Sequence, residues 1–259
     1  MSLQEEIVEV RGAKIQLYKG GKGSPLLYLH SFMGESGELP FLELLGRQFM
    51  LYAPVQPGFS RSEGLERIDK IEDMVFLYVD LIEALGLEQV LLVGSSMGGW
   101  IAAELAVHHP RLISKLVLID ALGLDLTKTP IADIFLPAPG ELRHLLFHDH
   151  SSEVAVGLLP DTLSEEATVS LYQSRRAAAR IGWNPYLCDP KLEQRLYRVT
   201  IPTLIVWGAE DRVVQTQHGE AYQRGVAGSR LVTVKEAGHL PALEKPADTT
   251  RLTTDFLKD

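Results

Sequence analysis

Segment 94–98 reads GSSMG, and its serine between two glycines is suited to nucleophilic chemistry. The apolar run 89–93 predicts a strand before it, and the run 100–107 predicts a helix after it. At such a strand-to-helix turn, glycines let the backbone bend sharply and the Ser96 hydroxyl stands clear of the sheet. We therefore predict that Ser96 is a nucleophile. The other role open to it is the N-cap of the helix.

A base and an acid for this serine follow later in the chain. Asp211 comes after the apolar run 203–207, and His239 comes after the strand-like run 230–235. A histidine titrates near neutral pH and can accept the serine proton, while a carboxylate fixes the orientation of the imidazole ring. The order Ser96, Asp211, His239, with each residue just beyond a predicted strand, predicts a catalytic triad at one edge of a sheet.

A second aspartate competes for the role of the acid. Asp120 ends the apolar run 115–119, which also predicts a strand. The end of that strand is the other place where such a sheet can supply a carboxylate to the histidine. We favour Asp211 and keep Asp120 as the alternative.

Two backbone amides are expected to bind the oxygen that becomes negatively charged during acyl transfer. One is the amide of Met97, directly after the nucleophile. The other follows the predicted strand 25–29, in a loop that begins His30-Ser31-Phe32, and we assign it to Phe32. Ser31 either alters the geometry of this loop or lends its hydroxyl to the site, and we interpret His30 as a packing residue.

The elements that must position these residues alternate along the chain. A hairpin is predicted around 11–13, and an amphipathic helix is predicted over 68–85, ending at Gly86. Strand–helix alternation predicts an α/β fold with a parallel sheet. The stretch 125–197 breaks the alternation, because it contains helix-like segments separated by prolines and no clear strand.

With these motifs assembled, the chain resembles the α/β-hydrolase superfamily over nearly its whole length. The segment 202–211 ends in Gly208-x-x-Asp211, and the segment 238–246 reads Gly-His-x-Pro-x-x-Glu-x-Pro. The turn 53–62 is an imperfect match, with Val55 where Asp is common in the family. The resemblance is nearest to bacterial esterases, lactonases and carbon–carbon bond hydrolases that carry a helical cap.

The resemblance implies a mostly parallel eight-stranded sheet with helices on both faces. It also implies a core formed by 1–124 and 198–259, with the cap, 125–197, inserted between the sixth and seventh strands. The implied activity is cleavage of a small ester, thioester or lactone through an acyl-enzyme on Ser96, with no cofactor. The alternatives are carbon–carbon bond hydrolysis of a ring-cleavage product and a receptor-like binder with little turnover.

Several polar residues of the cap have more than one interpretation. His144, His148 and His150 form a metal site, contact substrate or do neither; the sequence lacks a catalytic zinc motif. Arg175 and Arg176 form a solvated helix face or bind a substrate carboxylate.

Bulk composition limits the classes of partner. The chain has 259 residues, and its net charge of −9 argues against nucleic acid and anionic membrane surfaces. It contains one cysteine, no apolar run long enough to cross a membrane and no apolar leader at its beginning. We expect a cytoplasmic enzyme with a small-molecule substrate and leave open whether it is a monomer or a homodimer.

Overall fold

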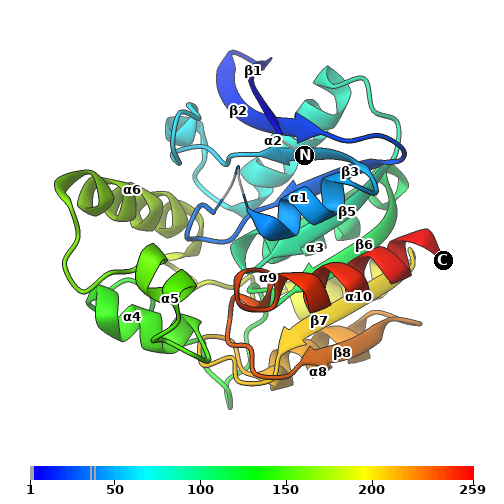
Figure 1. The fold of residues 1–259 in the computed structure, drawn as a ribbon. Helices are drawn as coiled ribbons and strands as arrows, with labels where there is room; N and C mark the ends of the chain where they lie inside the picture. The colour runs from blue at the N-terminus through cyan, green and yellow to red at the C-terminus, as the bar shows by residue number, and fades with distance from the viewer. Residues whose placement is uncertain (1–2, 36, 38) are drawn as a thin grey trace.

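A mixed eight-stranded sheet runs through the computed structural model, which describes residues 3–35, 37 and 39–259 (Figure 1). The strand order is β1-β2-β4-β3-β5-β6-β7-β8. Strand β2 is antiparallel to β1 and β4, and every other neighbouring pair is parallel. The predicted α/β fold with a mostly parallel sheet is therefore confirmed. The strands are β1 (Gln4–Val10), β2 (Ala13–Gly20), β3 (Pro25–Leu29), β4 (Met50–Pro54), β5 (Val90–Ser95), β6 (Ile113–Ile119), β7 (Thr203–Gly208) and β8 (Arg230–Val234).

Helices cover both faces of the sheet. Helices α2, α3 and α8 pack on one face, and α1 and α10 pack on the other (Figure 1). The core helices are α1 (Pro40–Gly46), α2 (Ile71–Ala84), α3 (Met97–His108), α8 (Thr216–Gly225), α9 (Pro241–Glu244) and α10 (Pro246–Lys258). Single 3₁₀ turns are η1 (Leu65–Arg67), η2 (Pro110–Leu112) and η3 (Leu196–Arg198).

Strand β5 shows why this sheet must be covered on both sides. All six of its residues are buried. Because successive side chains of a strand point to opposite faces, Leu91 and Val93 join the core under α1 and α10, while Leu92 joins the core under α2 and α3. Such a strand has no polar face, so its sequence is a continuous apolar run rather than an alternating one.

A group of helices lies between β6 and β7, as predicted for the cap. These are α4 (Pro139–Leu146), α5 (Glu153–Leu158), α6 (Glu165–Gly182) and α7 (Leu192–Arg195). Helices α4, α5 and α6 lie together to one side of the sheet (Figure 1). Pro139 begins α4 and Pro190 lies shortly before α7, because a proline lacks the amide that a helix interior requires. Helices α5 and α6 instead begin at the serine N-caps Ser152 and Ser164. The boundaries of the cap at 125 and 197 stay a prediction.

None of the described helices is both long and apolar enough to cross a bilayer. The expectation that the sequence begins without an apolar leader concerns a segment that includes residues 1–2, and these two residues lie outside the described part of the chain.

Candidate active site

A strained turn holds Ser96 between β5 and α3. Ser96 has φ 52° and ψ −114°, a backbone conformation that non-glycine residues seldom adopt. A Cβ atom on Gly94 would lie 2.3 Å from the carbonyl oxygen of Gly98, and one on Gly98 would lie 2.1 Å from that of Leu29. Both glycines are therefore required by close backbone approach. The Ser96 side chain makes no capping hydrogen bond to α3, which removes the support for the N-cap role.

Ser96, His239 and Asp211 form a continuous hydrogen-bonded chain. Ser96 Oγ lies 2.7 Å from His239 Nε2, and His239 Nδ1 lies 2.8 Å from Asp211 Oδ2. The other Asp211 oxygen, Oδ1, accepts hydrogen bonds from the amides of Val213 at 2.8 Å and Val214 at 2.9 Å. This leaves Oδ2 free to accept the Nδ1 proton, so Nε2 is the nitrogen that can accept the serine proton. Ser96 and His239 are fully buried.

Asp120, the alternative acid, is close to this chain but does not take the place of Asp211. Its Oδ1 accepts a hydrogen bond from the Gly208 amide at 2.8 Å, and it makes no hydrogen bond to His239 among the described atoms. Asp120, Asp211 and His239 each bring one ligand-type atom within 4.8 Å of the others. Both ring nitrogens of His239 are already hydrogen-bonded, so this cluster is explained by the triad.

The loop that carries His239 is tied to the end of α4. The His239 amide donates to the carbonyl of Leu146 at 2.8 Å. The Glu244 carboxylate accepts from the amides of Gly238 at 2.6 Å, His148 at 3.1 Å and Asp149 at 3.1 Å. Glu244 was visible as part of the motif 238–246, but its role as a bridge between the core and the cap was missed.

The two expected oxyanion donors lie on the turns after β3 and β5. Within the described residues, neither the Phe32 amide nor the Met97 amide donates a hydrogen bond to a protein atom. The Phe32 and His239 rings are 6.2 Å apart, centre to centre, which places the turn after β3 beside His239. Both amides are thus available to a substrate oxygen, and their role as an oxyanion hole stays a prediction.

Ser31 is used inside the loop rather than pointing at the nucleophile. Its hydroxyl donates to Glu35 Oε2 and accepts from the Met33 amide at 3.0 Å, while its amide donates to Glu35 Oε1 at 2.8 Å. The Tyr28 hydroxyl also donates to Glu35, at 3.3 Å. Burial raises the pKa of Glu35 above its usual value. Because Ser31 does not have a positive φ, a serine fits here without strain.

His30 is a structural residue of the same loop, as interpreted from the sequence. Its Nε2 accepts the Gln56 amide proton at 2.8 Å, so its Nδ1 carries a proton that it donates to the Ser31 carbonyl at 2.7 Å. Burial lowers the pKa of His30 to about 4, because a charged ring has no water around it. The neutral ring fastens the loop that begins at His30, after β3, to the segment after β4.

The polar cap residues are mostly used within the cap. The His144 and His150 rings stack 3.6 Å apart, and His148 Nδ1 lies 4.0 Å from Glu210 Oε2. Arg175 Nη2 donates to the Pro137 carbonyl at 2.6 Å. The side chain of Arg176 is on an exposed position of α6, where a solvated face was one of its two interpretations.

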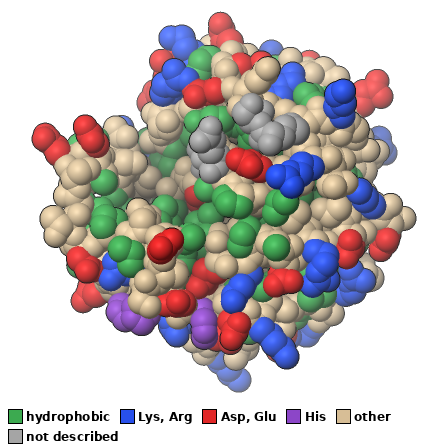
Figure 2. Space-filling view, in the orientation of Figure 1, with side chains coloured by type: hydrophobic (Ala, Val, Ile, Leu, Met, Phe, Trp, Pro, Cys, Tyr) green, Lys and Arg blue, Asp and Glu red, His purple; other side chains and the backbone are tan. Residues whose placement is uncertain are grey.

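A small apolar cavity separates the cap from the oxyanion loop. It measures about 110 Å³ and is lined by Met33 on the loop and by seven residues of 158–174, none of the eight charged. This volume is well below the roughly 300 Å³ at which ordinary ligand pockets begin. Figure 2 shows the surface hollowed between the cap and the core, with hydrophobic side chains gathered along the hollow.

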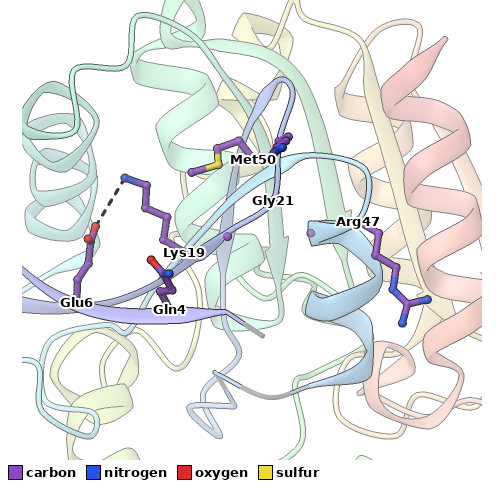
Figure 3. A pocket seen from close by; sticks show the side chains of 9 residues that line it. Gln4, Glu6, Lys19, Gly21, Arg47 and Met50 are labelled. Carbon is purple, nitrogen blue, oxygen red and sulfur yellow. Dashed lines mark ion pairs between the residues drawn. The ribbon is translucent and has the colours of Figure 1, made fainter. Parts of the chain in front are cut away.

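A larger pocket, about 550 Å³, lies at the opposite edge of the sheet from the triad (Figure 3). Its lining includes Met50, which begins β4, whereas the triad residues follow the ends of parallel strands. Lys19 Nζ lies 3.9 Å from Glu6 Oε1, and the Arg47 side chain points away from Lys19 (Figure 3). The basic groups therefore do not converge on one ligand position.

Comparisons with known proteins agree with this fold. The sequence model described as the Alpha/beta hydrolase family matches residues 26–252. The chain is 26% identical to 2-hydroxy-6-oxo-6-phenylhexa-2,4-dienoate hydrolase of Comamonas testosteroni, over 94% of this chain and 91% of that protein. It is 28% identical to 2-hydroxymuconate semialdehyde hydrolase of Pseudomonas sp. (strain CF600), over 96% and 92% respectively. The crystal structure of a bacterial membrane phospholipase A aligns with a TM-score of 0.86 at 25% identity, covering 99% of this chain and 86% of that one.

Proposed function

The chain belongs to the alpha/beta hydrolase family, and from that premise we propose that it is a serine hydrolase of small, uncharged carboxylic esters. The observation that carries the proposal is the hydrogen-bonded chain from Ser96 Oγ through His239 to Asp211, held at the strained turn after β5. A serine in this arrangement is activated as a nucleophile by its neighbouring base.

The reaction proceeds in two halves on the same groups. His239 Nε2 takes the proton from Ser96 Oγ as the oxygen attacks the ester carbonyl, and the imidazolium then gives that proton to the departing alcohol. Water attacks the resulting acyl-enzyme after losing a proton to His239, and the acid leaves as the proton returns to Ser96. The amides of Phe32 and Met97 hold the negative oxygen in both tetrahedral intermediates.

Substrate entry requires the cap to move. Ser96 and His239 have no exposed surface in this structure, so the closed cap shields the acyl-enzyme from bulk water. Glu244 holds the amides of His148 and Asp149, just after α4, and we therefore propose that the part of the cap that moves lies further along, over the small cavity.

The lining of that cavity favours an uncharged ester. A substrate with carboxylates needs cationic partners in the pocket, because a buried unpaired charge is costly. The cavity offers none, and two arginines close to its lining in sequence or contact are engaged elsewhere: Arg143 with Asp161 and the Leu159 carbonyl, and Arg175 with the Pro137 carbonyl. An acyl group of a few carbons suits its volume.

A second candidate is carbon–carbon bond hydrolysis of a ring-cleavage dienoate. The observation in its favour is the pair of curated relatives named as dienoate and semialdehyde hydrolases, which match this chain over nearly its whole length. The same triad would serve that reaction. A receptor-like binder without turnover is the remaining alternative.

Steady-state assays on matched substrates separate these candidates. We expect kcat/KM for short-chain p-nitrophenyl esters to exceed that for 2-hydroxy-6-oxo-dienoates by at least about a hundredfold, since a buried uncompensated charge costs several kcal/mol. Thioesters and lactones of the same acyl length extend the panel. A preference for the dienoate would overturn the ester proposal, and tight binding with no turnover of any substrate would favour the receptor.

A further inference from the structure

Asp120 is a buried carboxyl group beside the triad that the two-step reaction does not use. It directly follows β6 and has a φ of 44°, a left-handed conformation that aspartate and asparagine tolerate better than most residues. Its side chain has no exposed surface. One oxygen, Oδ1, accepts the Gly208 amide proton, while Oδ2 receives a hydrogen bond from no donor among the described residues.

Asp120 and Asp211 are too close to be charged at the same time without a large cost. Each places an oxygen within 4.8 Å of the other, and both residues are buried. Two carboxylates in such a site share one negative charge, and the proton stays on the group with fewer donors around it. Asp211 accepts from two amides and from His239, whereas Asp120 accepts from one amide.

We propose that Asp120 is a positioning residue that keeps a proton at neutral pH and donates it in a hydrogen bond to Asp211. Asp120 then stands behind the triad of Ser96, His239 and Asp211 and acts on it only through Asp211. The proposal goes beyond the proposed function but rests on it for its kinetic consequences. The groups that face Asp120 agree with it: burial, the Asp211 carboxylate and the more distant Glu244 all raise the pKa of Asp120 well above its usual range.

The proton on Asp120 has a consequence for the base. When the Asp120–Asp211 pair carries a single negative charge, it stabilises the imidazolium that His239 forms during the reaction without keeping the ring protonated beforehand. A second charge at this distance would hold the ring protonated and stop it from taking the Ser96 proton. Asp120 also holds the Asp211 carboxylate in the plane that His239 requires, because a hydrogen bond from behind restricts its rotation.

Asp120→Asn is the sharpest variant, since an amide keeps a donor for Asp211 and tolerates the same φ. We expect kcat/KM within about threefold of the wild type and an acid limb of the pH–rate profile displaced by less than about 0.3 pH unit, because no charge is lost. A displacement of about one unit or more to lower pH would mean that Asp120 is normally an anion, and would overturn the proposal. Asp125→Asn, on the exposed segment that follows, controls for the general effect of losing a negative charge.

Asp120→Gly removes the donor while permitting the same backbone. We expect kcat to fall by about ten- to a hundredfold with KM little changed, and Asn at the same position to restore it. Equal losses in the Gly and Asn variants would contradict a role through the hydrogen bond to Asp211.

A direct measurement of the proton needs no catalysis. In protein labelled with ¹³C at the aspartate side-chain carboxyl carbon, we expect one neutral carboxyl resonance at pH 7 that is absent from Asp120→Asn. If every aspartate is ionised at pH 7, or if the neutral resonance persists in the variant, the proposal is wrong. If Asp120→Asn does not fold, Asp120→Gly takes its place for assigning the resonance, and a wild-type spectrum without a neutral aspartate still overturns the proposal. A protein that shows the neutral aspartate but hydrolyses nothing would refute the proposed function and leave the shared proton standing.

Discussion

Glu244 offers the most informative perturbation, because one side chain joins the histidine loop to the cap. Its Oε2 accepts from the amides of Gly238 and His148, and its Oε1 accepts from the amide of Asp149. Glu244→Ala removes both acceptor oxygens and with them all three hydrogen bonds. The Gly238 amide is then left without a partner beside a backbone so close that a Cβ on Gly238 would lie 2.6 Å from the Leu146 oxygen. The two other amides are nearer to solvent, so water can replace part of what they lose.

The expected cost is about 2–4 kcal/mol of unfolding free energy, with the larger share from the buried Gly238 amide. For a chain of this length such a loss lowers the melting temperature by roughly 5–15 °C. Because His239 follows Gly238 directly, displacement of the loop also lengthens the bond to Ser96, and we expect kcat to fall at least about tenfold. Glu244→Gln keeps one acceptor oxygen for the Gly238 and His148 amides, so its losses of unfolding free energy and of kcat should be much smaller.

Urea unfolding and steady-state kinetics on the same preparations test this reasoning. Glu236→Ala is the matched control, because Lys245 is the one ion-pair partner of Glu236 within the described part of the chain, and ion pairs at the surface contribute about 0–1 kcal/mol. If Glu244→Ala were as stable and as active as Glu236→Ala, the bridge between the cap and the histidine loop would have no energetic importance and the reasoning would be refuted.

Three further outcomes are expected. Asp211→Asn should lower kcat by about 10³–10⁴ with little change in fold, because an amide favours the wrong tautomer of His239; near wild-type turnover in stopped-flow assays would argue that Asp120 supplies the acid. Burial raises the pKa of Glu104 from 4.5 to about 7, so the folded state holds a proton that the unfolded state releases, and this contribution to stability is lost as the pH rises from 4.5 to 7. The unfolding free energy of Glu104→Gln, measured by urea titration relative to wild type, should therefore increase by about 2–3 kcal/mol over that pH range. A difference in unfolding free energy that is the same at all pH values would contradict a neutral Glu104. Leu171→Ala enlarges the cavity and should shift the ester preference towards acyl chains longer by two to four carbons, which a chain-length series would show as a displaced optimum.

The sequence was most informative where chemistry and backbone geometry demand particular residue types. A Cβ atom at position 94 or 98 would lie only 2.1–2.3 Å from a backbone oxygen, so both positions require glycine. The turn around Ser96 is therefore recognisable from residue types alone. The strand that leads into it, β5, is buried on both faces and therefore reads as an apolar run. Helix α2 begins at Ile71, three residues after the predicted start at Ile68, because helix ends depend on local capping more than on periodicity.

The sequence did not reveal which side chains pair within a loop or between distant segments. Nothing in the local pattern shows that Ser31 would pair with Glu35, or that Glu244 would hold amides of the cap. The choice between Asp120 and Asp211 depended on which carboxylate reaches the Nδ1 atom of His239, a distance that only the assembled sheet defines. The polar cap residues had open interpretations for the same reason.

The most direct test of the account is the intact mass of the protein after incubation with a fluorophosphonate, measured beside Ser96→Ala. We expect one adduct per chain on the wild type and none on the variant, because only a serine activated by a neighbouring base reacts with such a probe. An adduct of equal yield on both proteins, or an unlabelled wild type that still hydrolyses esters, would contradict the assignment of Ser96 as the nucleophile.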